Sequence, residues 1–198
     1  MLDILGSVEL DTVALAAILL VSTLVIARFY TGSVLLDIKY LEFWGTARQL
    51  FMPLIDKLAK RLVGISAENH AKEIEHVADI RNSPREIAET IQANSKREFE
   101  VSVLSGLKRD WDGNTEVASI VGYMGNRPWP NSPEWLRAKQ VHIFMFDLGD
   151  KTRVCAHVEA NSWRPDLWRD HLFKGDSFDA EQGVRITKAW LSLQSDNE

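Results

Sequence analysis

The 198-residue sequence contains only one cysteine, Cys155, and carries a formal net charge of −5. A single cysteine excludes an intrachain disulfide framework and a four-cysteine zinc site within one chain. The acidic balance argues against a nucleic-acid binder, which normally has a basic face. The sequence also lacks the GxxxxGK[ST], GxGxxG, HExxH and GxSxG motifs, so nucleotidases, dehydrogenases, zincins and α/β-hydrolases of standard type are not expected. No cofactor is expected, and no motif names a family.

Lys and Arg are absent from the first eleven residues, and residues 12–27 form an uncharged run. A bilayer core of ~30 Å needs roughly 20 helical residues, so a span would extend the run by a few residues at each end. Arg28 would then reach the interface beside Tyr30. The sequence predicts a transmembrane anchor within 1–32. A buried helix of a soluble domain and a cleaved signal peptide are the alternatives, although a signal peptide normally begins with basic residues.

Basic residues near the run lie only on its C-terminal side. Residues 1–64 contain six basic residues, and all of them follow the run, beginning with Arg28. The positive-inside rule therefore predicts a single-pass protein with its N-terminus outside and its C-terminal domain in the cytoplasm. The lone cysteine agrees with a reducing compartment.

Two helical regions are expected between the anchor and the C-terminal domain. Residues 33–64 contain apolar stripes at helical spacing, such as Leu50, Leu54 and Leu58, and Pro53 is expected to interrupt them. We predict two amphipathic helices, over 34–51 and 53–63, lying on the inner leaflet. The alternative is a hairpin that packs on the soluble domain or on a second copy of the chain.

Residues 65–96 are expected to form a helical stalk. A thin apolar stripe predicts a helix over 67–80. Ser83, Pro84 and Glu86 form a helix start signal, because serine caps the first turn, proline suits its first position and glutamate completes a capping box. This second helix should run to about Asn94.

The last part of the chain, residues 97–194, has the pattern of an α+β domain. Alternating apolar residues predict a strand from Phe99, and further strands are expected over 116–124, 141–147 and 152–160. Short helices are expected after Ser132, over 163–175 and from Asp179. The order β-β-α-β-β-α-α predicts a small antiparallel sheet with helices.

One hairpin places two histidines opposite each other. If Gly149 and Asp150 form its two-residue turn, then His142 faces His157, and Glu159 lies on the same face. Two imidazoles and a carboxylate suit a zinc ion or general acid–base catalysis. The alternative is a polar, solvent-facing side of the sheet, and a register shift of one residue would move the whole set.

Tryptophan and arginine side chains provide a second candidate site. Arg127, Trp129, Trp135 and Trp163 lie in two segments that combine aromatic residues with arginine and proline. Such residues are typical anchors of protein–protein interfaces. The alternatives are that the rings fill the core of the domain or line a groove for a sugar or a peptide.

These features favour a non-enzymatic protein that holds a partner-binding domain at a membrane. A scaffold or accessory protein and a structural protein of a virion membrane both fit. The expected partners are the lipid bilayer and a protein or a second copy of the chain, with no nucleic acid. The alternative functions are a membrane-tethered metal-dependent enzyme or a ligand sensor that uses the face of His142, His157 and Glu159.

Overall fold

The structure is a computed structural model that describes residues 23, 36–63, 69–103, 106–167 and 178–193. Nearly all of the run over 12–27 therefore lies outside the described residues, and so does most of the helix predicted over 163–175. Among the helices that the structure describes, none combines the length and the apolar character that a bilayer crossing requires.

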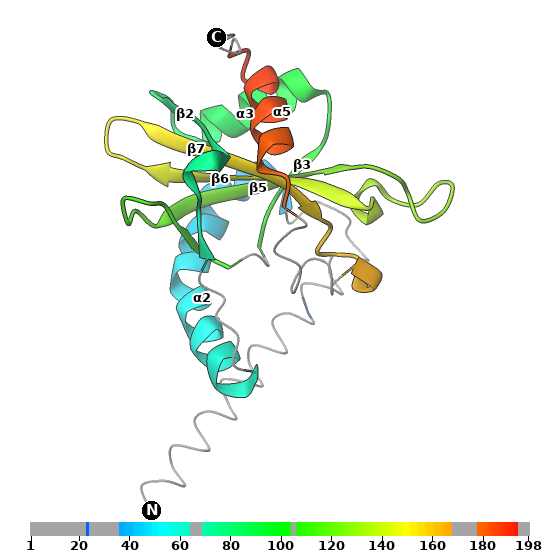
Figure 1. Cartoon of the computed structure of the whole chain (residues 1–198), viewed down its shortest axis with the longest axis horizontal. Helices are drawn as coiled ribbons and strands as arrows, with labels where there is room; N and C mark the ends of the chain where they lie inside the picture. Colours follow the sequence, from blue (N-terminus) through cyan, green and yellow to red (C-terminus); the bar gives the residue numbers. More distant parts are fainter. Residues whose placement is uncertain (1–22, 24–35, 64–68, 104–105, 168–177, 194–198) are drawn as a thin grey trace, which may run out of the picture.

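A five-stranded antiparallel sheet forms the centre of the domain (Figure 1), which supports the predicted α+β class. The strands lie in the order β2-β7-β6-β5-β3. Their bounds are β2 His76–Ile80, β3 Phe99–Val101, β5 Glu116–Met124, β6 Lys139–Asp147 and β7 Thr152–Ala160. A separate parallel pair consists of β1 (Asn69–His70) and β4 (Lys108–Arg109).

Helices α3 (Pro84–Ser95) and α5 (Ala180–Trp190) cover one face of the sheet (Figure 1). Ile87 and Ile91 of α3 are buried in one core cluster with Ile143 of β6 and Ala156 of β7. The predicted start of α3 is confirmed, because the side chain of Ser83 accepts a hydrogen bond from the backbone of its third helical residue. The apolar sides of β6 and β7 thus form the main core.

Helix α2 (Leu41–Val63) lies on the opposite side of the sheet and follows the short 3₁₀ turn η2 (Ile38–Tyr40) (Figure 1). A Cβ atom on Gly45 would lie 2.2 Å from the backbone oxygen of Val117, so the first turns of α2 are in close contact with β5. The predicted interruption at Pro53 is wrong, since Pro53 lies inside α2. Tertiary packing of the earlier turns outweighs the local preference of proline to end a helix.

The helix predicted over 67–80 is also wrong. The described part of this segment contains β1, the short 3₁₀ turn η3 (Glu73–Glu75) and β2, which pairs with β7. Val77 faces the core, and Asp79 contacts Arg153 of β7. These long-range contacts decide the conformation over a weak helical pattern. Residues 76–95 consequently belong to the sheet domain and do not form a separate stalk.

Smaller differences concern the connections of the domain. The helix expected after Ser132 is the 3₁₀ turn η4 (Glu134–Leu136), and η5 (Pro165–Leu167) lies at the start of the helix expected over 163–175. The last predicted helix is confirmed as α5, with Asp179 accepting a hydrogen bond from the backbone of Gln182.

Candidate functional site

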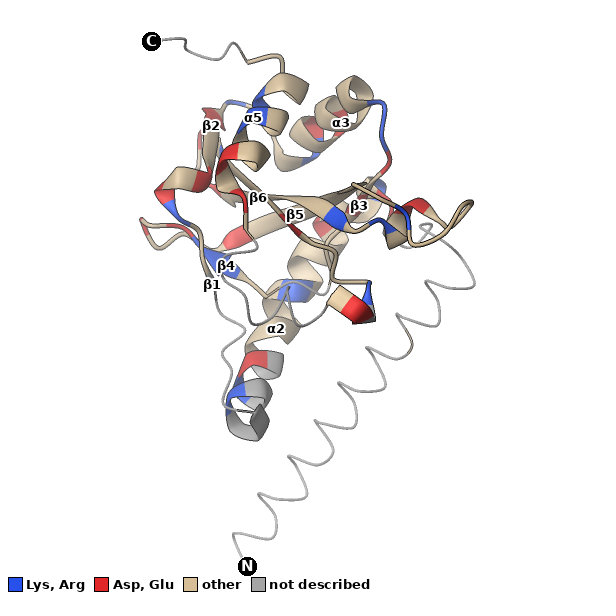
Figure 2. Ribbon diagram, turned by 45° about the vertical axis from the view of Figure 1, so that its right-hand side comes forward, with Lys and Arg blue, Asp and Glu red and all other residues tan. Residues whose placement is uncertain are grey.

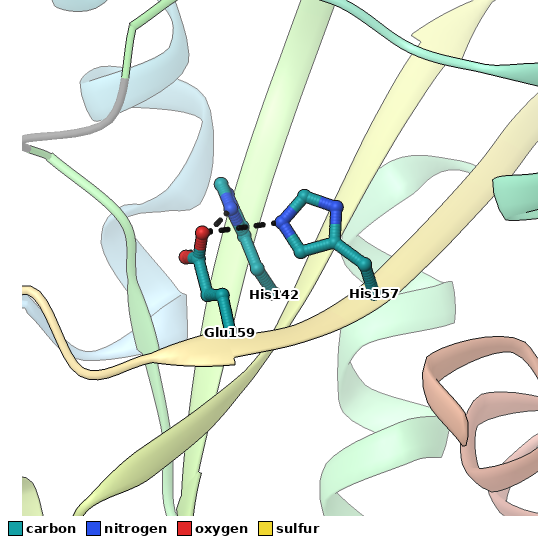
Figure 3. A group of neighbouring side chains, drawn as sticks. All are labelled: His142, His157 and Glu159. Carbon is teal, nitrogen blue, oxygen red and sulfur yellow. Dashed lines mark hydrogen bonds and ion pairs between the residues drawn. The ribbon is translucent and has the colours of Figure 1, made fainter. Parts of the chain in front are cut away.

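The predicted register of the β6–β7 hairpin is confirmed. His142 pairs with His157, and Phe144 pairs with Cys155. Gly149 adopts a φ of +91° in the turn, a conformation that favours glycine. The two histidines therefore lie side by side on one face of adjacent strands, as Figure 3 shows.

The carboxylate of Glu159 contacts both imidazoles (Figure 3). Its Oε1 atom is 3.2 Å from Nδ1 of His142, and its Oε2 atom is 3.3 Å from Nε2 of His157. One potential ligand atom from each of the three side chains lies within 4.8 Å of the other two. We call these three residues the His–Glu cluster.

Oxygen atoms also contact the second nitrogen of each imidazole. Nε2 of His142 is 2.6 Å from the hydroxyl oxygen of Ser119 on β5, and Nδ1 of His157 is 2.5 Å from Oε1 of Glu75 on η3. Gln140 donates a hydrogen bond of 2.5 Å to Glu159. Ser119 and Gln140 could have been found from the strand register, whereas Glu75 lies 82 residues before His157 and carries no sequence signal.

The His–Glu cluster is buried. His142, His157 and Glu159 are 1%, 1% and 3% exposed. The same side of the sheet carries a second apolar group consisting of Phe144, Phe146, Cys155 and Ala71, with Trp111 against it. The expectation of a solvent-facing polar side is therefore wrong, and these polar groups must satisfy one another inside the domain.

The environment changes the ionisation of all three groups. Burial lowers the pKa of His142 to about 4, against the opposing effect of Glu159. Burial would raise the pKa of Glu159, but its contacts with His142 and His157 outweigh this and hold it well below the usual range. Burial opposes the charged form of His157, yet contacts with Glu159 and Glu75 raise its pKa. A neutral His142 and a carboxylate at Glu159 follow at neutral pH.

This arrangement suits the binding of a small ion better than direct catalysis. A general acid or base must come within hydrogen-bond reach of its substrate. The cluster is almost without exposed surface, and the ring of Phe178 lies 4.7 Å from that of His157, measured between centroids. A metal ion would need only the three ligand atoms and a small fourth ligand such as water.

The predicted tryptophan site is divided between two places. Trp135 and Trp163 are brought together, with ring centroids 6.3 Å apart in an edge-to-face arrangement, and both are half-buried. Trp129 is 56% exposed. Arg127 forms an ion pair with Glu134 in the same loop. The first two rings thus pack against each other, whereas Trp129 is exposed to solvent.

A separate cleft of about 570 Å³ lies between the start of α2, the start of α3 and the turn of the β6–β7 hairpin. Glu42, Arg81, Arg85 and Lys151 are among the residues that line it. None of the predicted site residues belongs to this lining, so the cleft and the His–Glu cluster are separate features.

Of the apolar stripes predicted over 33–64, the structure describes the side chains of Leu50 and Phe51, while those of Leu54 and Leu58 lie outside the described part. Phe43 is 64% exposed, Leu50 is 66% exposed and Phe51 is 50% exposed, whereas Arg48 and Met52 face the domain. Figure 2 shows that α2 extends beyond the sheet on this side of the molecule. Exposed apolar residues gathered on one helix face are typical of surfaces that contact a protein or a membrane.

Comparisons with protein families, curated proteins and solved structures found no match to this chain.

Proposed function

We propose that the chain is a single-pass membrane protein that holds its α+β domain at the cytoplasmic surface of a bilayer and presents it to a protein partner. The exposed apolar face of α2, formed by Phe43, Leu50 and Phe51, is the observation that carries this proposal. Such a face lies favourably at the boundary between lipid headgroups and acyl chains. The role is that of a scaffold or accessory protein and requires no enzymatic activity.

The position of α2 in the chain supports its contact with lipid. Residues 28–35 separate the uncharged run over 12–27 from Leu36, where the continuous description of the fold begins. A chain extends at most ~3.3–3.6 Å per residue, so these residues can bridge about 30 Å. The apolar face of α2 is therefore restricted to the neighbourhood of the membrane if the run spans it.

The charges of α2 are consistent with the same surface. Lys57 is exposed, and Lys60 is half-exposed and pairs with Asp56. Lysine residues on an interfacial helix attract acidic lipids of the cytoplasmic leaflet. These two lysines are among the six basic residues of 1–64, all of which follow the uncharged run and favour an outside N-terminus and a cytoplasmic domain.

A fluorescence experiment on the full chain tests the lipid contact. Leu50→Cys and Glu89→Cys are each labelled with an environment-sensitive dye and reconstituted in vesicles that carry nitroxide-labelled lipid. Glu89 is exposed on α3, across the sheet from α2, and serves as the matched control. We expect strong quenching at position 50 and little at position 89. Equal quenching at both positions, or none at position 50, would reject the contact.

Fractionation and protease protection test the anchor and its orientation. The full chain should stay with membranes after carbonate washing, and deletion of 12–27 should release it. Protease added to intact cells should leave the α+β domain uncut. Release of the full chain by carbonate contradicts the anchor, and digestion of the domain outside the cell contradicts the orientation.

Trp129 is the position at which we expect the protein partner. A photocrosslinker in place of Trp129 should form an adduct in native membranes, whereas one in place of the exposed Asp150 should not. An adduct of two copies of the chain identifies self-association, and an adduct with another protein identifies a different partner. Absence of any adduct at position 129 rejects this part of the proposal.

A further inference from the structure

We propose that His142, His157 and Glu159 bind one divalent transition-metal ion of the zinc class inside the α+β domain. The contacts of Glu159 with the two imidazoles, at 3.2 Å and 3.3 Å, provide the first argument. Zinc binds nitrogen and oxygen ligands at ~2.0–2.2 Å, so two ligands of one tetrahedral ion lie roughly 3.3–3.5 Å apart. Each imidazole thus already has the spacing to the carboxylate that two ligands of one ion have, and the ligand atoms of all three side chains lie within 4.8 Å of one another.

The groups behind the imidazoles provide the second argument. A histidine that binds a metal through one nitrogen normally holds an oxygen atom at the other, which fixes the orientation of the ring. His157 contacts Glu75 in this way, and His142 contacts Ser119. Both rings consequently turn their remaining nitrogen toward Glu159.

Buried polar atoms without a hydrogen-bond partner provide an independent third argument. Nδ1 of His142 is one of them: Glu159 is close to it but lacks the alignment of an N–H···O hydrogen bond. The side-chain oxygen of Gln140, which neighbours the cluster, is another. An unsatisfied buried polar atom is costly, and a cation between His142 and the carboxylate would bind the deprotonated Nδ1 and so satisfy it.

A proton is the competing occupant of the cluster. The charged groups that act on His157 are Glu159, Glu75 and Lys108, whose ammonium lies 4.6 Å from the centre of the Phe144 ring. Without a metal, a proton on His157 between the two carboxylates would balance the charge. A metal ligand must be the neutral imidazole, so the ion and this proton exclude each other.

The ligand set restricts the class of metal. Calcium and magnesium prefer oxygen ligands, whereas imidazole nitrogen suits zinc, iron, nickel and copper. An ion here would connect β6 and β7 directly, and through Glu75 it would also fix η3. Binding to the folded state alone would raise the thermal stability of the domain.

The test uses the purified full chain in detergent, stripped with a chelator and then titrated separately with zinc and cobalt ions. Calorimetry should give one zinc ion per chain, and cobalt should give the visible absorption bands of four-coordinate geometry. His157→Ala and Glu159→Gln should lower zinc affinity at least 100-fold. Glu75→Gln, which changes a positioning residue, should lower it roughly 10–100-fold. The control His70→Ala changes an exposed histidine on β1 and should leave affinity unchanged.

Several results would overturn the metal site. If the zinc titration gives no protein-dependent heat and the cobalt spectrum shows a six-coordinate ion, no metal binds at the cluster, and a proton is its occupant. Equal affinity in the wild type, His157→Ala and Glu159→Gln would place the ion elsewhere. If these variants fail to fold, X-ray absorption spectroscopy of the zinc-loaded wild type provides the test. A zinc coordination shell without two imidazoles would contradict the site. None of these results depends on the membrane proposal, since all measurements are made in detergent.

Discussion

Arg48 of α2 and Glu116 of β5 form a buried ion pair, with Nη1 and Oε1 separated by 2.6 Å. The second carboxylate oxygen of Glu116 accepts a hydrogen bond from the backbone of Lys108, and Nη2 of Arg48 donates one to the backbone of Gly106. This pair fixes which side of α2 faces the sheet. The exposed apolar face of α2 is consequently held in one orientation relative to the domain.

We expect Arg48→Met to destabilise the protein by about 3–5 kcal/mol, because it leaves the Glu116 carboxylate buried without its guanidinium partner. Urea denaturation of the full chain in detergent measures this loss. The double variant Arg48→Met with Glu116→Leu should be more stable than Arg48→Met alone, since it removes both charges. If the loss in the double variant equals the sum of the losses in Arg48→Met and in Glu116→Leu, the two side chains do not interact.

The β6–β7 hairpin shows what could be predicted from the sequence. A two-residue turn with glycine determines the pairing of every residue in its strands, so the contact between His142 and His157 followed from counting. The same reasoning gave the cap of α3 at Ser83, which depends on a few adjacent residues. Local chemistry with a fixed geometry was sufficient for both.

Features that depend on distant parts of the chain could not be predicted. Residues 76–80 form an edge strand only because β7 is present to pair with them, and Glu75 meets His157 through that same pairing. The burial of the His–Glu cluster likewise depends on how the rest of the chain covers this side of the sheet. Helical periodicity contains no information on such contacts.

Gly183 of α5 lies against the backbone of His157, where a Cβ atom would be 2.3 Å from the Cα atom. Helix propensity alone would make Gly183→Ala stabilising by about 1 kcal/mol. We expect the opposite sign, a loss of roughly 1–3 kcal/mol, because the methyl group overlaps β7. Thermal unfolding of the full chain measures this loss of stability. The control Ala189→Gly, at an exposed position of the same helix, should cost about 1 kcal/mol. A stabilised Gly183→Ala would contradict the close contact.

Cys155 should be unreactive in the native protein. It is fully buried beside Phe144 and Phe146, and this burial raises the pKa of the thiol, an effect that Glu75 reinforces. Only the thiolate reacts rapidly with alkylating reagents. Mass spectrometry after iodoacetamide treatment should show no modification in the wild type until denaturant is added. The Leu50→Cys variant should gain one native modification, and rapid native alkylation of Cys155 would contradict its burial.

Acid should weaken the contact between Asp110 and Arg153, whose Oδ2 and Nη1 atoms are 2.8 Å apart. Burial would raise the pKa of Asp110, but hydrogen bonds from Asn114 and the charge of Arg153 outweigh it and hold the pKa below 3.8. A group with a lowered pKa stabilises the fold at pH values above its unfolded pKa, and this stabilisation is lost as the pH falls through the folded value. Stability measured by denaturation should therefore fall below about pH 4.

Asp110→Asn provides the comparison for this acid response. The amide cannot titrate, so the variant should be less stable than the wild type at pH 7, and the difference should shrink as the pH falls below 4. Asp112→Asn is a suitable control, because Asp112 also contacts Arg153 but is largely exposed, so its loss should matter less. A constant difference between Asp110→Asn and the wild type from pH 7 to pH 3 would mean that Asp110 has the same pKa in the folded and the unfolded state, which contradicts the lowered pKa.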